Sequence, residues 1–135
     1  MSLAAPDKLC IHTITTKPWS IEVAAKKFVA AGVKGITVWR DALEGKNIAQ
    51  TGNMLRENGL TIVSLCRGGF FPNKDAAKRK AAINDNLKAI EKAAALETSM
   101  LVLVCGADPA QSLEDSRKQI QEALKLFFRK QKLPE

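Results

Sequence analysis

Residues 60–96 read LTIVSLCRGGFFPNKDAAKRKAAINDNLKAIEKAAAL, and this stretch decides the fold class. Its start, LTIVSLC, is rich in apolar and β-branched residues, which predicts a strand that is buried on both faces. The glycines and the proline of RGGFFP then interrupt the strand pattern. A helix is expected from near Asp75, with an apolar line through Ile83, Leu87, Ile90 and Ala94. The stretch therefore predicts one βα unit.

The same arrangement occurs four times along the chain. The other strands are predicted at 8–15, 35–39 and 99–105. Their helices are predicted from Ser20 to Gly32, from Asn47 to Asn58, and after a capping-box pattern at Ser112 and Asp115. Strands that alternate with helices indicate the α/β class with a parallel sheet. An open three-layer sheet and part of a (β/α) barrel both fit, and in both the loops after the strands form the functional face.

Composition and cysteine usage set the class of protein. The chain has 135 residues, of which 46% are hydrophobic, and we predict a single domain over residues 1–135. No apolar run is long enough to cross a bilayer, and the N-terminus does not have the pattern of a secretion signal. Each of Cys10, Cys66 and Cys105 lies in an apolar run, which predicts free core thiols. We therefore expect a cytoplasmic protein without a membrane segment.

The charge balance leaves the kind of partner open. A formal net charge of +7 is compatible with phosphorylated metabolites, with nucleic acid or with simple solubility. Basic residues gather in a tail at 125–135, which is interpreted as the end of the last helix or as a contact for an acidic partner. The chain has no Tyr and only 5% aromatic residues, so we do not expect the stacking platform of a single-strand nucleic-acid binder.

Polar side chains follow the ends of three predicted strands. His12 lies in or at the end of the first strand, and Trp39 and Arg40 end the second. Arg67 ends the third strand, where its planar donors could bind a carboxylate or phosphate through two hydrogen bonds. The alternatives are that Arg67 pairs with a neighbouring carboxylate and that His12 is a satisfied core residue.

Gly68 and Gly69 directly follow Arg67. They would allow the backbone to turn sharply and to approach a ligand closely, and their N–H groups could face an anion. The alternative is that the two glycines merely permit a turn.

Other kinds of site find little support in the sequence. Three cysteines and His12 could form a zinc site, but no cysteine has a CxxC partner, and we predict no metal site on this chain. The chain has no nucleophile elbow, no GxGxxG after its first strand and no Walker loop. The catalytic residues, if the chain has any, cannot be named from the sequence.

Four segments in order carry a resemblance to a known family: TVWRD, TIVSLCRGGFFP, DNLKAIEKAAAL and LVLVCG. The chain resembles the sugar phosphate isomerase/epimerase family, whose fold is the xylose isomerase-like TIM barrel. The resemblance implies a divalent metal in the complete enzyme and isomerisation or epimerisation of a sugar, sugar phosphate or polyol by proton transfer. It also implies that His12, Trp39, Arg40 and Arg67 line the substrate cavity, with Gly68 and Gly69 beside them.

The chain departs from this family in its length. A complete barrel takes about 250 residues, and this sequence supplies about four of its eight βα units. In the family, the metal ligands and the proton-abstracting groups come from later strands. We therefore expect a half barrel that binds substrate but is inactive alone, and that pairs with another copy or with a complementary half-barrel. The alternative is a non-catalytic α/β module that self-associates and binds phosphate or nucleic acid through its basic surface.

Overall fold

The computed structural model describes residues 5–130, and by internal contacts the chain divides into two compact units. The first unit comprises the residues up to Arg67 together with residues 90–102. The second comprises residues 68–89 and the residues from Leu103 onward. Whether residues 1–135 behave as a single domain stays a prediction.

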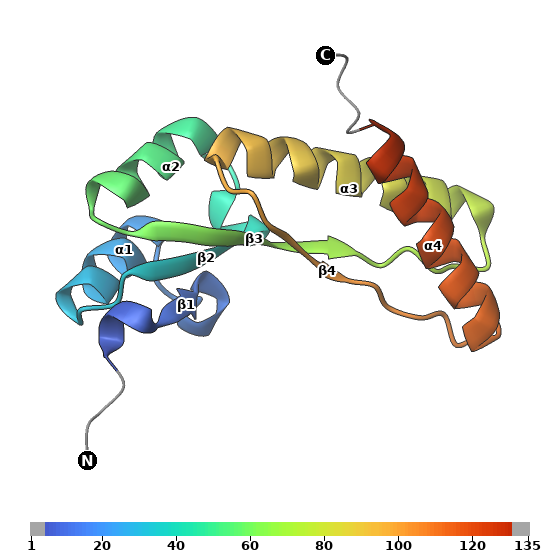
Figure 1. Ribbon diagram of the computed structural model, residues 1–135, viewed down its shortest axis with the longest axis horizontal. Coiled ribbons are helices and arrows are strands. Elements are labelled where there is room, and N and C mark those ends of the chain that lie inside the picture. The colour runs from blue at the N-terminus through green and yellow to red at the C-terminus, as the bar shows by residue number, and fades with distance from the viewer. Residues whose placement is uncertain (1–4, 131–135) are drawn as a thin grey trace. The chain divides into compact units, whose positions relative to one another are not determined.

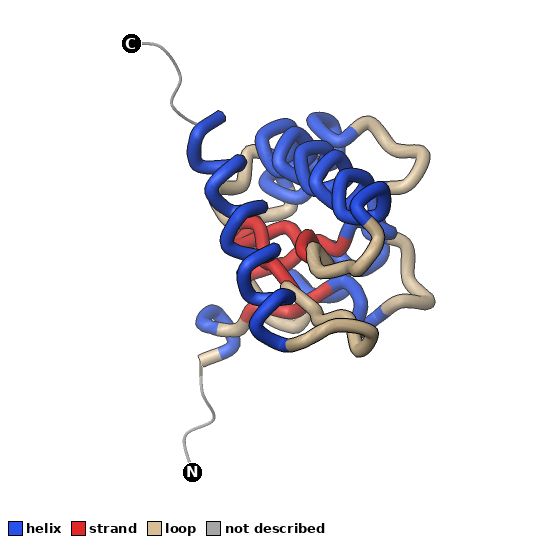
Figure 2. The backbone as a smooth tube through the Cα atoms, turned by 90° about the vertical axis from the view of Figure 1, so that its right-hand side faces the viewer, coloured by secondary structure: helices blue, strands red, loops and turns tan. Residues whose placement is uncertain are grey.

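Strands and helices alternate along the chain, as the sequence predicts (Figures 1 and 2). The strands are β1 (Cys10–His12), β2 (Gly35–Trp39), β3 (Thr61–Gly69) and β4 (Leu101–Val104). The α-helices are α1 (Ile21–Ala30), α2 (Ile48–Glu57), α3 (Ala76–Leu96) and α4 (Leu113–Lys130). Short 3-10 helices are η1 (Pro6–Lys8), η2 (Thr13–Thr16) and η3 (Arg40–Leu43). The strands form one sheet in the order β1-β2-β3-β4, so the α/β class and the four βα units are confirmed.

The register of the sheet decides which side chains share a face. β1 pairs in parallel with β2, and β2 pairs in parallel with β3. The pairing of β2 with β3 shifts between Ile36 and Thr37, because Ile36 stands opposite Ile62 whereas Thr37 stands opposite Ser64. Val63 is therefore the extra residue of a β-bulge.

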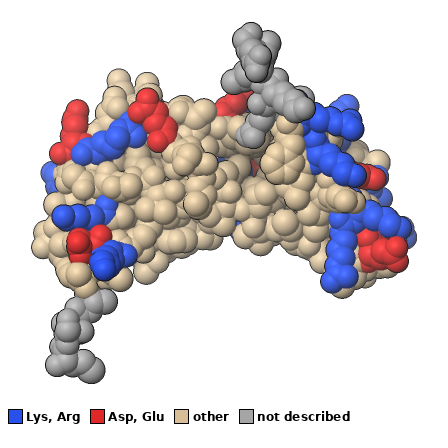
Figure 3. Space-filling view, viewed as in Figure 1, with Lys and Arg blue, Asp and Glu red and all other residues tan. Residues whose placement is uncertain are grey.

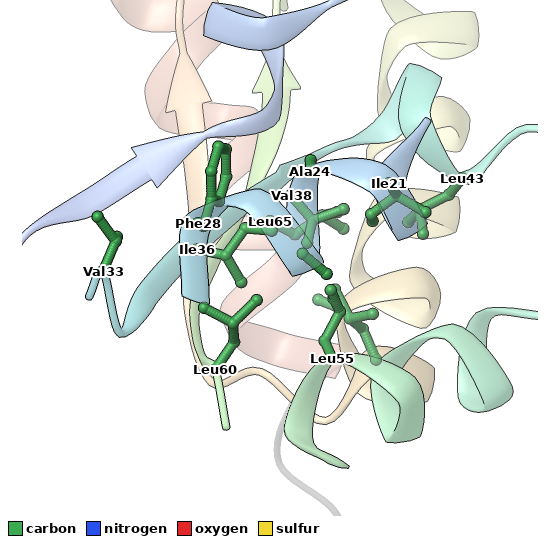
Figure 4. Packing of buried hydrophobic residues seen from close by; sticks show 13 residues of the cluster. Ile21, Ala24, Phe28, Val33, Ile36, Val38, Leu43, Leu55, Leu60 and Leu65 are labelled. Atoms are coloured by element: carbon green, nitrogen blue, oxygen red, sulfur yellow. The ribbon is translucent and has the colours of Figure 1, made fainter. Parts of the chain in front are cut away.

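The helices α1 and α2 and the end of α3 cover one face of the sheet in the first unit. Figure 4 shows this core, to which the sheet contributes Ile36, Val38 and Leu65, each 0% exposed. Helix α1 begins after Ser20, whose Oγ accepts the N–H of Val23 at 3.2 Å, and it contributes Phe28. Full burial of one such apolar side chain contributes about 1.5–3 kcal/mol, so this core stabilises the unit.

The second unit has its own contacts. The rings of Phe71 and Phe127 pack with their centroids 5.6 Å apart. Ser112 Oγ accepts the N–H of Asp115 at 3.0 Å, which confirms the predicted cap of α4. Asp108 accepts the backbone N–H of Ala110 and that of Lys74, and these two hydrogen bonds lower the pKa of its carboxyl group.

Several predicted boundaries differ from the structure. The first strand ends at His12 rather than at residue 15, because the chain coils into η2 there. The third strand extends to Gly69, so Arg67 lies in the strand and not in the following loop. The prediction of core thiols holds for Cys66, which is buried, but Cys10 is exposed. Cys10 is the first residue of the short edge strand β1, and its Sγ lies 3.3 Å from Thr37 Oγ1.

Two further predictions concern the ends of the chain and the membrane. The first part of the basic tail, up to Lys130, is the last part of α4, whereas residues 131–135 lie outside the described residues. Among residues 5–130, no helix has the length and apolar character needed to cross a membrane.

Candidate functional site

The ends of β1 and β2 bring an imidazole and an indole together. Trp39 Nε1 donates a hydrogen bond to His12 Nδ1 at 3.1 Å, and the two ring centroids lie 6.4 Å apart. The backbone N–H of Trp39 donates to Thr13 Oγ1 at 2.9 Å. Both rings are partly buried, and Thr13 is buried. The sequence placed His12 and Trp39 at neighbouring strand ends, and the structure brings them into contact.

The hydrogen bond from Trp39 fixes the tautomer of His12. Because Nδ1 is the acceptor, the proton of the neutral imidazole resides on Nε2. His12 therefore offers an N–H donor at Nε2. This arrangement suits hydrogen bonding to a hydroxyl or to another acceptor on a ligand.

Two arginines complete the cluster around Trp39. The guanidinium carbon of Arg67 lies 5.7 Å from the centroid of the indole ring, within the range of a cation–π contact. Arg40 Nη1 donates a long hydrogen bond, 3.5 Å, to the backbone carbonyl of Arg67. Arg67 is exposed and Arg40 is partly buried. Trp39 thus points toward His12 and Arg67, and Arg40 reaches across to β3 instead of turning away into its loop.

Gly68 and Gly69 belong to the second unit, where they serve close packing. The N–H of Gly69 donates to Asn86 Oδ1 at 2.6 Å, and Asn86 Nδ2 donates to the carbonyl of Gly69 at 2.9 Å. A Cβ atom at Gly69 would overlap the backbone of Val104, and one at Gly68 would meet Asn86 and Leu103. The expectation that the Gly69 N–H faces an anion is therefore wrong, because Asn86 accepts that proton. A substrate-binding role of the two glycines stays a prediction.

Sequence reasoning missed Asn86 and Thr13. Asn86 is 1% exposed on α3 and its amide bridges Gly69 and the carbonyl of Ala82, so it holds the end of β3 in place. A polar residue one position before Leu87, in the apolar line of a helix, was the available signal for Asn86. Thr13 gave no such signal, because its partner is the backbone N–H of Trp39 on β2.

Cys66 lies beside the cluster but is not suited to act as a nucleophile. Burial raises the pKa of the Cys66 thiol, and the nearby positive charge of Arg67 lowers it by a smaller amount. The net upward shift favours the neutral thiol, whereas the thiolate is the reactive form.

A divalent metal, which the family resemblance implies, does not fit the described residues. Among residues 5–130, no group of three or more His, Cys, Asp or Glu side chains lies close enough together to hold a metal ion. His12 is the one histidine of the sequence, and its Nδ1 already accepts the hydrogen bond of Trp39.

The cluster of His12, Trp39, Arg40 and Arg67 is suited to binding rather than to proton transfer. Two guanidinium groups provide charged donors, and the imidazole provides a neutral donor. The indole provides an apolar wall, to which the C–H face of a sugar can pack. None of these four side chains is a carboxylate, so the cluster matches an anionic or hydroxyl-rich ligand.

A family model described as a xylose isomerase-like TIM barrel matches residues 25–131. A search of curated proteins finds no match. Among solved structures, a protein from Sinorhizobium meliloti 1021 is 33% identical with a TM-score of 0.78. The alignment covers 88% of this chain and 44% of that protein.

Two further structures share the fold at lower identity. One is a xylose isomerase domain-containing protein from Salmonella typhimurium, with 19% identity, a TM-score of 0.73, and coverage of 96% of this chain and 48% of that one. The other is a D-psicose 3-epimerase in the presence of D-fructose, with 14% identity, a TM-score of 0.70, and coverage of 87% and 46%. The chain thus spans less than half the length of each of these structures.

Proposed function

Because this chain belongs to the xylose isomerase-like TIM barrel family, we propose that it supplies substrate-binding strand ends of a sugar isomerase or epimerase. The observation that carries the proposal is the contact network centred on Trp39, which joins the ends of three neighbouring strands. In parallel sheets of this kind, ligands bind at the carboxyl ends of the strands. The position of the network at the strand ends and its hydrogen-bond donors both favour a role in binding substrate.

Each side chain has a distinct role in this proposal. Trp39 packs against the C–H face of the sugar, and His12 Nε2 donates to a hydroxyl. Arg67 binds the anionic end of a sugar phosphate or a pair of hydroxyls through its planar donors. Arg40 supports the backbone at Arg67 and adds positive charge. The protein acts in the cytoplasm, where such phosphorylated substrates occur.

The proposal assigns metal binding and proton transfer to βα units outside this sequence. β1 and β4 are the two edge strands of the sheet. Apolar side chains next to both edges are exposed: Leu9 by 47%, Met100 by 53% and Val104 by 41%. Unpaired edges with exposed apolar residues favour association. We therefore expect a second copy or a complementary half-barrel to cover them, and light scattering should show an assembly larger than the 14.7 kDa chain.

Sugar binding at Trp39 tests the proposed function. In the Trp19→Phe variant, Trp39 is the one tryptophan left, and D-fructose should change its fluorescence in a saturable way. Arg67→Ala should weaken this binding by about tenfold or more, because charged hydrogen bonds are lost. Arg117→Ala, an exposed arginine on α4, removes the same charge elsewhere and should leave it unchanged. Unchanged fluorescence with D-fructose and with inorganic phosphate would overturn the proposal.

The alternative function is a self-associating module that binds phosphate or nucleic acid, and it depends on the formal charge of +7. On the face shown in Figure 3, Lys and Arg side chains lie next to Asp and Glu side chains in mixed groups. This face does not present a continuous surface of positive charge, which is the feature that favours binding of nucleic acid. Salt-sensitive binding to DNA of unrelated sequences would favour the alternative.

A further inference from the structure

A pocket lies in the first unit, outside the cluster around Trp39. It has a volume of about 360 Å³, close to the lower end of the range of small-molecule sites. Its walls come from the segment between β1 and α1, which includes Lys17 and Trp19, and from the segment after β2, which includes Asp41 and Glu44. The pocket therefore lies at the carboxyl ends of β1 and β2, where ligands bind in folds of this kind.

The pocket is separate from the candidate site around Trp39. Ile21 and Ala24 of α1 line it, and both belong to the core on the helix-covered face of the sheet. His12 and Trp39 alternate with the core residues of their strands and so point to the opposite face. Thr13 links the two places, because it lines the pocket and accepts the backbone N–H of Trp39.

An aromatic wall in the pocket is held in place by its neighbours. The rings of Trp19 and Phe28 have centroids 6.5 Å apart, and Lys27 Nζ lies 5.0 Å from the centroid of the indole. Trp19 nevertheless remains 41% exposed. A positioned, partly exposed indole can pack against the C–H face of a ligand at little cost in side-chain entropy.

The pocket carries charges of both signs. Lys46 Nζ lies 2.6 Å from Glu22 Oε1, so this lysine is already paired. Within the part of the chain that the structure describes, Lys17, Asp41 and Glu44 form no ion pair. Their donors and acceptors are thus available to a ligand in the pocket.

The mixture of charges selects the class of ligand. A phosphate would be attracted by Lys17 but repelled by Asp41 and Glu44. A simple cation would be attracted by Asp41 and Glu44 but repelled by Lys17. A neutral hydroxyl both donates and accepts, so a compound with several hydroxyl groups satisfies the carboxylates and the ammonium together. Its C–H groups would contact the indole and the apolar floor formed by Ile21 and Ala24.

We propose that this pocket, lined by Lys17, Trp19, Asp41 and Glu44, is a second binding site for a neutral polyol, distinct from the site around Trp39. It goes beyond the proposed function, because none of its charged residues belongs to the Trp39 cluster. Asp41 and Glu44 accept from neighbouring hydroxyls, and Lys17 donates to a third. Trp19 packs against the carbon chain.

The chain offers a direct test, because its two tryptophans lie in the two sites. In the Trp39→Phe variant, Trp19 alone emits, and xylitol should change its fluorescence in a saturable way. In the unmodified chain, the two indole N–H signals in heteronuclear NMR report both sites at once, so the test does not depend on the variant. Inorganic phosphate should not move the Trp19 signal.

Charge variants identify the residues that bind the polyol. Asp41→Ala and Glu44→Ala should each weaken xylitol binding at Trp19 by about tenfold, the loss expected for a hydrogen bond to a charged group. Glu57→Ala is the matched control, because this exposed carboxylate of the first unit lies outside the pocket and its removal should change nothing.

The outcomes separate this site from the proposed function. A Trp19 signal that does not respond to xylitol, or that responds equally in Asp41→Ala and Glu44→Ala, overturns the second site. A response of Trp19 to phosphate in place of xylitol overturns the assignment of ligand class. The Trp39 signal reports the candidate site independently, so either site can fail while the other stands.

Discussion

The two faces of β2 carry different kinds of side chain although they belong to the same five residues. Ile36 and Val38 point to the helices and are both 0% exposed. On the other face, Thr37 bonds to Ser64, and Trp39 bonds to His12. Because successive strand residues point in opposite directions, one short strand carries core packing and the candidate site on alternate positions. Substitutions on the two faces should therefore have separable effects.

The bulge in β3 preserves this separation. Leu65 joins the core, whereas Ser64 and Cys66 stand opposite Thr37 and Trp39. If the register of β2 and β3 did not shift, the apolar Val63 would stand opposite Thr37 in place of Ser64. The buried hydroxyl of Thr37 would then lose its partner on β3. The bulge thus matches polar with polar on the face that carries the site.

The largest expected effect in the comparison of the two sheet faces comes from Leu65→Ala on the core face. Leu65 is 0% exposed, and loss of its side chain should lower the free energy of unfolding by about 2–5 kcal/mol. Urea unfolding followed by circular dichroism measures this change. Val63→Ala is the control, because Val63 is 39% exposed and its truncation should cost less. Equal losses in the two variants would contradict the assignment of the faces.

A smaller loss is expected on the polar face. Thr37 Oγ1 and Ser64 Oγ lie 2.8 Å apart and both residues are buried. Thr37→Val leaves the Ser64 hydroxyl without this partner and should lower the free energy of unfolding by about 1–3 kcal/mol. The double variant Thr37→Val with Ser64→Ala should lose less than the sum of the single variants. Strict additivity in urea unfolding would show that the two hydroxyls do not interact.

Local sequence pattern predicts the middle of each element well, but not its ends. β2 matches its predicted bounds because its apolar run is continuous and Gly35 begins it. The end of β3 was not predictable, because its extension to Gly69 depends on distant partners. Asn86 bonds to both backbone groups of Gly69, and the N–H of Phe70 donates to the carbonyl of Val104. No local propensity encodes these contacts.

For the candidate site, the sequence predicts which residues lie near one another but not how they contact each other. His12, Trp39 and Arg67 could be placed together because parallel strands end at the same edge of a sheet. The direction of each hydrogen bond, such as that from Trp39 Nε1 to His12, depends on side-chain geometry that sequence does not give. The pocket at Trp19 was missed for a related reason, since its walls come from two loops separated in sequence.

The change Trp39→Phe should affect binding more than stability. It removes the hydrogen bond to His12, which contributes about 0.5–1.5 kcal/mol to the free energy of unfolding. It also removes the indole that Arg67 contacts, so D-fructose binding, measured by calorimetry, should weaken more strongly than the protein is destabilised. Trp19→Phe is the control and should leave that binding intact. A loss of stability as large as that of Leu65→Ala would show that Trp39 is a core residue.

The smallest effect concerns Cys66, which lies on the site face and is 3% exposed. Burial raises the pKa of its thiol in the folded state, so the unfolded chain loses this proton first as pH rises. The contribution of Cys66 to stability is therefore fully present below the ordinary thiol pKa, about 8.5, and is lost as pH rises toward the folded value. Urea unfolding at increasing pH should show this decline, and Cys66→Ala should reduce it. Cys10→Ala is the control, because Cys10 is exposed, and a decline that disappears in that variant instead would contradict the role of burial at Cys66.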